Sequence, residues 1–251
     1  AEKAKKELSS ATTTNINLAA CLAIRGKKVL ILDIDPQGNT TSGIGVRKRN
    51  LKDTIYNILV DKDYDPRKAI IKTSVNNLDL IPASVDLAGA EVELVSVDGR
   101  ENALKEGLDK IKGDYDYIFI DCPPSLGLLT INSLAAVDSV LVPIQCEFYA
   151  LEGVSQLVST IELVKKSLNP KLEIQGVILS MFDGRTNLSL QVVQEVKRYF
   201  GNKVYSTVIP RNVRLAEAPS YGMPITEYDP KSKGAEAYGD FADEFLELEE
   251  D

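Results

Sequence analysis

Short apolar runs alternate along this chain with longer segments whose apolar residues recur at helical spacing. The short runs, which predict buried strands, lie at 29–34, 78–81, 117–120, 139–144, 174–180 and 204–208. Helical patterns lie at 12–24, 51–59, 101–111, 151–168, 188–199 and 235–248. This alternation predicts an α/β fold, with a doubly wound, mainly parallel sheet and helices on both of its faces.

Two of the predicted strands lead into aspartates. Asp33 and Asp35 stand at the end of the 29–34 run, and Asp121 directly follows the 117–120 run. Parallel strands deliver such side chains to one edge of the sheet, where ligands bind in folds of this class. The carboxylates therefore predict a site for a metal ion or a reacting water, although simple capping of the next turn remains an alternative.

The start of the chain lacks the phosphate-binding loop that these strands would serve. Such a loop reads GxxxxGK[ST] and leads directly into a helix, whereas residues 6–14 read KELSSATTT and contain no glycine. The hydroxyls of Thr12 and Thr13 suit either a ligand or the cap of a helix start. Residues 1–8 are rich in helix-favouring Ala, Lys, Glu and Leu. We therefore predict a helical N-terminal segment and a first strand that is missing or altered.

Several segments, taken in order, resemble the ParA/Soj family of chromosome- and plasmid-partitioning ATPases, in the MinD-like branch of P-loop proteins. These segments are 31–39, 121–125, 131–153 and 208–220. The resemblance implies a deviant-Walker P-loop NTPase-like domain over residues 12–242, preceded by an atypical segment, 1–11, and followed by an acidic tail, 243–251. Family members carry KGGVGKTTT in place of residues 6–14, so Ala11 stands where they have the phosphate-binding lysine.

The same resemblance implies roles for individual residues. Asp35 would be the catalytic carboxylate that positions the attacking water, and Asp121 the Walker B aspartate. The magnesium ligands would be Thr12, Asp35 and Asp121. The nucleotide-binding set would be Thr12, Thr13, Met181, Pro210, Arg211 and Asn212, with Asn212 reading the edge of the base.

By resemblance, the function is ATP-dependent dimerisation and nonspecific binding of double-stranded DNA. Hydrolysis would be stimulated by a ParB/Spo0J-like partition protein, with ATP and magnesium as cofactors. Replacement of GGVGK by ELSSA predicts impaired ATP binding and hydrolysis, because the lost lysine bond alone contributes about 1.5–3 kcal/mol. The enzyme assignment therefore stays open, and a monomer is possible in place of the family's homodimer. The alternatives are a fully active ParA-type ATPase and a MinD-like regulatory ATPase.

Charge is distributed unevenly and bears on the partners. Residues 234–251 hold eight acids and no base, which accounts for the whole net charge of −8. Residues 185–233 hold eight bases against four acids, an excess that suits a phosphate backbone as well as ordinary surface. The acidic tail argues against a basic membrane-binding helix. The predicted DNA-contacting residues are Arg185, Lys197, Arg198 and Arg214.

Length and composition set the remaining expectations. The chain has 251 residues, 44% of them hydrophobic, which is enough for the core of one α/β domain. No apolar run reaches the roughly 18 residues of a membrane span, and no signal-peptide pattern opens the sequence. Cys21, Cys122 and Cys146 lie in apolar segments without metal-binding spacing. We expect a cytoplasmic, nucleoid-associated protein with reduced thiols and no membrane contact.

Overall fold

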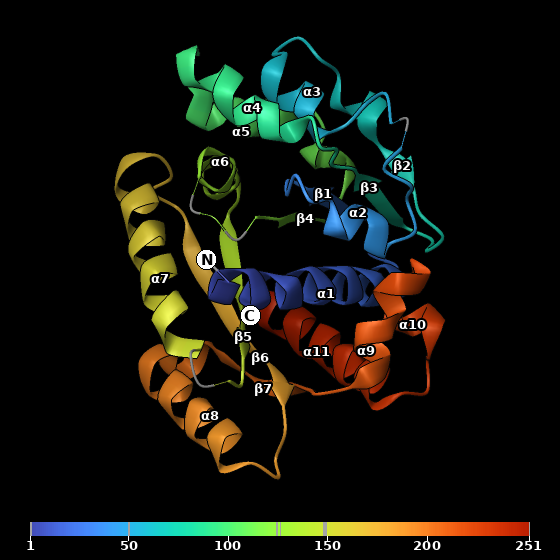
Figure 1. Ribbon diagram of the computed structural model, residues 1–251, viewed down its shortest axis with the longest axis vertical. Coiled ribbons are helices and arrows are strands. Elements are labelled where there is room, and N and C mark those ends of the chain that lie inside the picture. Colours follow the sequence, from blue (N-terminus) through green and yellow to red (C-terminus); the bar gives the residue numbers. More distant parts are fainter. Residues whose placement is uncertain (1, 50, 124, 126, 148–149, 251) are drawn as a thin grey trace.

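The computed structural model describes residues 2–49, 51–123, 125, 127–147 and 150–250 (Figure 1). The strands are β1 (Val29–Asp33), β2 (Ile71–Lys72), β3 (Leu78–Ile81), β4 (Tyr117–Asp121), β5 (Ser139–Gln145), β6 (Glu173–Phe182) and β7 (Val204–Pro210). The helices are α1 (Glu2–Ile24), α2 (Asn39–Gly43), α3 (Ile55–Val60), α4 (Leu87–Glu93), α5 (Ala103–Leu108), α6 (Leu128–Ala136), α7 (Ala150–Ser167), α8 (Asn187–Phe200), α9 (Val213–Glu217), α10 (Ile225–Tyr228) and α11 (Lys233–Glu250).

The strands form two sheets, with the orders β2-β3-β1-β4 and β5-β6-β7. All pairings are parallel except that of the short β2 with β3. The predicted α/β class and its mainly parallel strands are thus confirmed. However, the strands are divided between two sheets, because β4 and β5 do not pair with each other.

Helices cover both faces of the first sheet, as the apolar strand sequences require. Ile31 of β1 faces the core formed with α1 and α11, whereas Leu30 and Leu32 face the core formed with α3, α4 and α5. Figure 1 shows these two groups of helices on opposite sides of the β1–β4 sheet. The second sheet packs against α7 and α8 through a separate cluster that includes Val177 and Val196.

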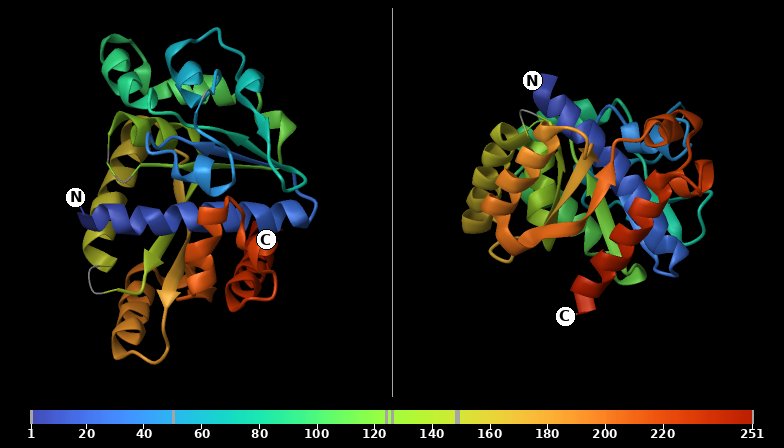
Figure 2. Two further views of the ribbon diagram at one scale, coloured as in Figure 1. Left: turned by 45° about the vertical axis from the view of Figure 1, so that its right-hand side comes forward. Right: turned by 90° about the horizontal axis from the view of Figure 1, so that it is seen from below.

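Helix α1 connects the two halves of the molecule. It packs against β1, β4 and β5, and therefore contacts both sheets (Figure 2). It is a single helix from Glu2 to Ile24, so it begins well before Thr12. The middle and C-terminal part of the helix, where Leu18 and Leu22 are fully buried, lies in the core.

Some elements differ from the sequence prediction in extent. The helix expected over 51–59 is α3, which starts later because the Thr54 side chain caps it by accepting a hydrogen bond from the Tyr56 backbone N–H. Helices α4 and α6 were not predicted. At the other end of the chain α11 continues past residue 243, and Phe245 is buried against Tyr117 and Phe119. Among the described helices, none has both the length and the apolar character that crossing a bilayer requires.

Candidate functional site

Asp121 is the centre of a buried polar cluster at the carboxyl end of β4. Its Oδ2 accepts hydrogen bonds from the hydroxyls of Thr12, at 2.8 Å, and Thr40, at 2.7 Å. Its Oδ1 accepts one from the Asn15 side-chain amide at 2.8 Å. The donors come from α1 and α2, so the cluster joins the two elements that flank the strand ends.

Asp33 ends β1 and stands in register with Asp121 on the neighbouring strand. Its Oδ2 accepts hydrogen bonds from the backbone N–H and the hydroxyl of Thr41, both at 2.7 Å. Its Oδ1 accepts a longer one, 3.2 Å, from the Asp35 backbone N–H. Asp33 is therefore a completely buried carboxylate that fixes the start of α2.

Asp35 lies beyond the end of β1 and is also largely buried. Its Oδ1 accepts a hydrogen bond from the Gln37 backbone N–H at 2.9 Å, which closes the turn before α2. Gly38 follows with φ +61°, a left-handed conformation that glycine adopts without strain. This turn brings Thr40 and Thr41 back to the two strand-end aspartates.

Burial and the close spacing of the carboxylates dominate the electrostatics of the cluster. Burial, and next the charge of Asp121, raise the pKa of Asp33 to about 7. Burial likewise raises the pKa of Asp121 to about 6, against the opposing effect of its three side-chain hydrogen bonds. Among the described residues from Thr12 onward, the donors to these carboxylates are hydroxyl, amide and backbone N–H groups, with no lysine or arginine.

The backbone around Thr12 lies inside a helix and not at a helix start. Thr12, Thr13 and Thr14 lie in the interior of α1, where each backbone N–H is committed to a carbonyl four residues earlier. The free N–H groups that make a helix start an anion site belong only to its first turn. Because α1 begins at Glu2, that first turn lies ahead of Thr12, and the threonines cap no helix start.

Magnesium is a different case, because its preferred ligands are oxygens. Thr12, Asp35 and Asp121 offer hydroxyl and carboxylate oxygens of the type that this cation binds. The Asp121 oxygens already accept three hydrogen bonds, so direct coordination would have to displace some of them. Among the described residues, no group of three His, Cys, Asp or Glu side chains is arranged to hold a metal ion.

The residues predicted to surround the base come together where β6 and β7 end. Phe182 and Pro210 are in register, and the Arg211 backbone N–H donates to the Phe182 carbonyl at 3.0 Å. Met181 has φ +55°, which is unusual for a residue with a side chain. The Asn212 side chain caps α9 by accepting a hydrogen bond from the Arg214 backbone N–H at 2.8 Å.

The four basic residues predicted to contact DNA are exposed, and they lie in or just before α8 and on α9. Arg185 precedes α8 and pairs with Asp183, with Nη2 and Oδ2 2.8 Å apart, and this pairing lowers the pKa of Asp183 to about 2. Arg214 lies on α9 and pairs with Glu217 at 2.9 Å. Figures 1 and 2 show α8 and α9 well apart.

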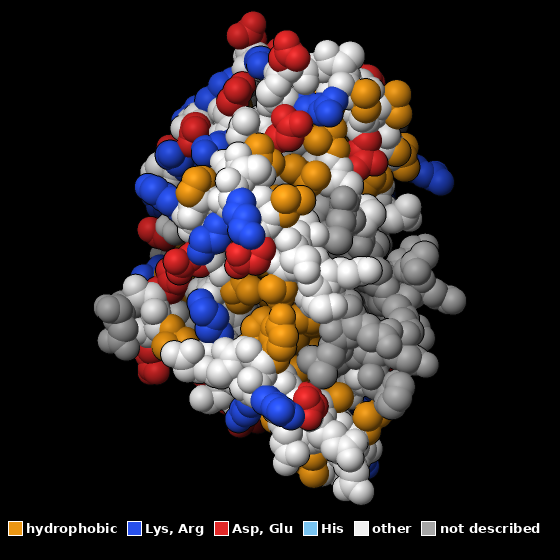
Figure 3. All heavy atoms as spheres, turned by 90° about the vertical axis from the view of Figure 1, so that its left-hand side faces the viewer, with side chains coloured by type: hydrophobic (Ala, Val, Ile, Leu, Met, Phe, Trp, Pro, Cys, Tyr) orange, Lys and Arg blue, Asp and Glu red, His pale blue; other side chains and the backbone are white. Residues whose placement is uncertain are grey.

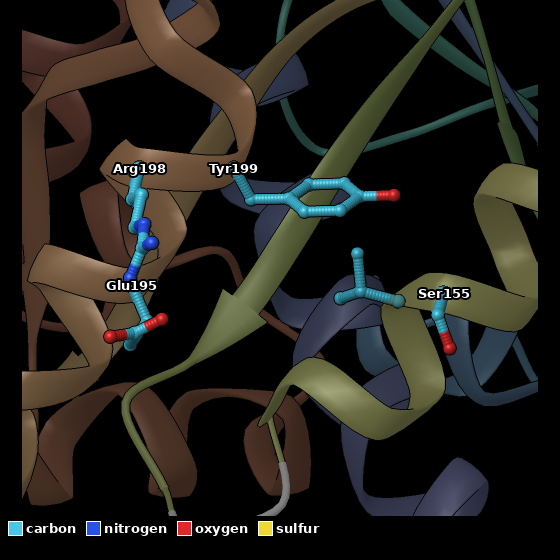
Figure 4. Close-up of a pocket in the computed structure, with 5 residues that line it drawn as sticks. Ser155, Glu195, Arg198 and Tyr199 are labelled. Carbon is cyan, nitrogen blue, oxygen red and sulfur yellow. The ribbon is translucent and has the colours of Figure 1, made fainter.

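The remaining two, Lys197 and Arg198, lie in the last turn of α8. Arg198 lines a cavity of about 300 Å³ between α7 and α8, together with Val154, Ser155, Glu195 and Tyr199. Figure 4 shows the Tyr199 ring extending toward α7, whereas Arg198 and Glu195 lie on the α8 side. The predicted basic residues therefore do not form one continuous patch.

Sequence reasoning missed three members of the site, namely Asn15, Thr40 and Thr41. Their hydrogen bonds to Asp121 and Asp33 are specific, but none of the three belongs to a motif that identifies it. The available signal was indirect, because the turn residues Gln37, Gly38 and Asn39 send the chain back toward the strand ends.

Comparison with known proteins places this geometry in a family. Residues 5–174 match the family model described as an AAA domain. The chain is 61% identical to sporulation initiation inhibitor protein Soj of Bacillus subtilis, over 93% of this chain and 92% of that protein. It is 54% identical to chromosome partitioning protein ParA of Myxococcus xanthus, over 90% of this chain and 80% of that protein.

A solved structure shares the whole fold as well. The structure of cobyrinic acid a,c-diamide synthase from Mycobacterium smegmatis with bound ADP and magnesium superposes with a TM-score of 0.83 at 38% identity. The match covers 96% of this chain and 90% of that one. These identities extend over 92% and 80% of the two sequence relatives, and they show that the chain belongs to the ParA/Soj family of chromosome-partitioning ATPases.

Proposed function

We propose that this chain is a ParA/Soj-type partitioning protein in which nucleotide binding and hydrolysis are impaired, so that it acts as a scaffold without an ATP switch. The observation that carries the proposal is the position of Thr12–Thr14 inside α1. A phosphate group binds at a helix start through backbone N–H groups that the helix leaves unpaired, and around Thr12–Thr14 these groups are committed within α1.

The charge of the site also weakens the binding of phosphate. Ala11 stands at the position of the family's phosphate-binding lysine. Loss of that charged hydrogen bond costs about 1.5–3 kcal/mol, which is roughly a tenfold to hundredfold loss in affinity. The buried Asp121 carboxylate would in addition repel the phosphates, because its described hydrogen-bond donors, Thr12, Asn15 and Thr40, are all uncharged.

The remaining family roles belong to the same proposal. In a repaired site Asp35 would position the attacking water, and Thr12, Asp35 and Asp121 would hold magnesium. ATP and magnesium are the cofactors to be expected, since the Mycobacterium smegmatis relative is described with bound ADP and magnesium. The nucleoside would lie against Thr13, Met181, Pro210, Arg211 and Asn212.

Partners follow from the family in the same way. Relatives named for chromosome partitioning support a ParB-like partner and nonspecific DNA as ligands, in the cytoplasm near the nucleoid. The DNA surface would comprise Arg185, Lys197, Arg198 and Arg214. ATP-driven dimerisation would align two such surfaces, so a chain that does not bind ATP would remain a weak DNA-binding monomer.

The test is the thermal stability of the chain with and without millimolar Mg-ATP. A ligand at a hundred times its Kd adds about 2.7 kcal/mol, which in a chain of this size raises Tm by several degrees. We expect no shift. A matched variant carries GGVGK at residues 7–11 and an apolar strand in place of residues 1–5, and it should regain the shift.

Different outcomes test the impaired binding of ATP and the catalytic role of Asp35. A Tm rise of several degrees in the unmodified chain would refute impaired binding. If the repaired variant binds Mg-ATP and hydrolyses it equally well with Asp35→Ala, then Asp35 is not catalytic.

A further inference from the structure

The loop that follows α2 carries three consecutive basic residues, Arg47, Lys48 and Arg49, which we call the basic loop. All three side chains are exposed. Lys48 donates a hydrogen bond to the Gln37 backbone carbonyl at 2.5 Å. Within the described part of the chain, no acid lies at ion-pair distance from any of the three. The basic loop therefore presents three positive charges that the protein does not balance locally.

The start of this loop is fixed by packing. Ile44 is buried in the core formed with α1 and α11, and Val46 packs against the same core. The Val46 backbone N–H donates to the Thr41 carbonyl at 3.0 Å, which ties the loop to the end of α2. Arg47 follows directly on this anchored residue, so the basic loop begins at a defined place on the surface.

Two glycines join the same loop to the segment after α9. Gly45 and Gly222 both have left-handed backbones, with φ +89° and +67°. A Cβ on Gly222 would lie only 2.6 Å from the Gly45 Cα, so the two backbones touch in a way that side chains would prevent. The contact brings Tyr221, the neighbour of Gly222, close to the basic loop. Figure 1 shows α2 next to the α9–α10 region, and α2 contacts the turn Ala218–Tyr221.

Tyr221 offers an aromatic ring to the solvent in a fixed orientation. One face of the ring stacks on Tyr228, with the ring centroids 4.9 Å apart and the planes inclined by 30°. Tyr228 is held in turn, because its hydroxyl donates to Glu217 at 3.0 Å. The Tyr221 residue is nevertheless 65% exposed, which leaves the other face of its ring open. An aromatic surface of this kind can stack with a ligand at little cost in conformational entropy.

The acids near Tyr221 already have a basic partner. Arg214 pairs with Glu217 at 2.9 Å and with Asp229 at 3.4 Å. Its charge is therefore balanced, in contrast to the charges of the basic loop. Figure 3 shows the opposite side of the molecule, where Lys and Arg side chains lie among Asp and Glu. The basic loop differs from that side because its positive charge is unbalanced and adjoins an exposed aromatic ring.

We propose that the basic loop and Tyr221 form a binding site for single-stranded nucleic acid. Sites of this type combine basic groups along the phosphate backbone with aromatic rings on which bases stack. Arg47 and Arg49 bind phosphates, and one base stacks on the open face of Tyr221. A duplex keeps its bases stacked on one another, so an exposed ring favours a single strand. This site is separate from the duplex-binding surface proposed above and needs no ATP.

The experiment measures binding of the full chain to fluorescent oligonucleotides by anisotropy, without nucleotide. The first probe is oligothymidylate of about 12 nucleotides, a length within the usual span of single-strand sites. The second is an abasic strand of the same length, which keeps the phosphates but has no bases, and the third is a duplex of that length. We expect saturable binding of oligothymidylate, and binding of the abasic strand that is weaker by about fivefold or more.

Variants separate stacking from charge. Tyr221→Ala should weaken oligothymidylate binding by about fivefold or more and leave abasic binding unchanged, whereas Tyr221→Phe should retain the affinity. Tyr199→Ala is the matched control, because Tyr199 is 59% exposed on α8, away from the basic loop, and it should have no effect.

The arginines are tested through the salt dependence. Arg47→Ala/Arg49→Ala should reduce the slope of log affinity against log salt concentration by about 1.4, since each phosphate contact on a single strand contributes about 0.7. Lys165→Ala/Lys166→Ala removes two basic residues from the last turn of α7 and should leave the slope unchanged.

Three results would overturn the proposal. Equal binding of the abasic strand and oligothymidylate would show attraction by charge alone. Binding of the duplex that exceeds that of the single strand and is indifferent to Tyr221→Ala would assign the loop to duplex DNA. Sedimentation with phosphatidylglycerol vesicles, without oligonucleotide binding, would make the patch a membrane contact. The outcome of the Mg-ATP experiment does not affect these results, because this assay contains no ATP.

Discussion

Asp33→Asn should remove most of the pH dependence of stability between pH 5 and 8. The Asp33 carboxylate is fully buried, and its pKa is raised to about 7, against about 3.9 in an unfolded chain. The folded state therefore holds a proton that the unfolded state releases. This contribution to stability is complete below the unfolded pKa and is lost as the pH rises through the folded pKa near 7.

The magnitude follows from the two pKa values. Between pH 5 and pH 8 the linkage relation gives a loss of about 2–3 kcal/mol for this one carboxylate. In a chain of 251 residues that corresponds to a fall in Tm of about 5–10 °C. Asp121, with its pKa raised to about 6, acts in the same direction over a lower pH range.

The substitution leaves most of the local structure in place. An amide oxygen can keep both hydrogen bonds from Thr41, and the amide nitrogen replaces the oxygen that accepts only the 3.2 Å bond from the Asp35 backbone. The loss of that bond changes the overall stability but not its slope with pH. The slope is therefore the informative quantity.

The assay is urea denaturation at pH 5, 6, 7 and 8 at constant ionic strength. The control is Asp98→Asn, at an exposed aspartate, which should keep the slope of the unmodified chain. If the unmodified chain and Asp33→Asn show the same change in unfolding free energy across this range, the reasoning about Asp33 is refuted.

Three further outcomes are expected. Asn17→Ala should cost about 1–3 kcal/mol in urea denaturation, because the buried Asn17 amide oxygen accepts the Ile225 backbone N–H at 2.7 Å; an unchanged midpoint would contradict this. Phe245→Ala should cost about 3–5 kcal/mol by the same measurement, since its ring is buried in an aromatic cluster, and an exposed control such as Leu248→Ala should have little effect. Binding of duplex DNA in a filter assay should be weak and independent of ATP, with a shallow slope of log affinity against log salt concentration. The double variant Arg185→Ala/Arg214→Ala should reduce that slope by the equivalent of at most about two phosphate contacts. Tight ATP-dependent binding would contradict the scaffold proposal.

The sequence by itself determined the elements and the family. Apolar runs predicted six of the strands close to their observed bounds, because burial on both faces of a parallel strand leaves a local signature that needs no knowledge of the partner strands. Asp33 and Asp121 could likewise be predicted from the sequence, because each stands at the end of an apolar run. The missing glycines and lysine around Ala11 were equally plain.

The tertiary structure decided which groups meet. The hydrogen bonds from Thr12 and Thr40 to Asp121 span 109 and 81 residues of chain, so no local pattern could specify them. The division into two sheets is also a property of packing. It follows from the absence of pairing between β4 and β5, which no local sequence pattern specifies. The amides of Thr12–Thr14 are committed within α1 because the helix extends back to Glu2, and that extent removes the anion site which a helix start would have offered.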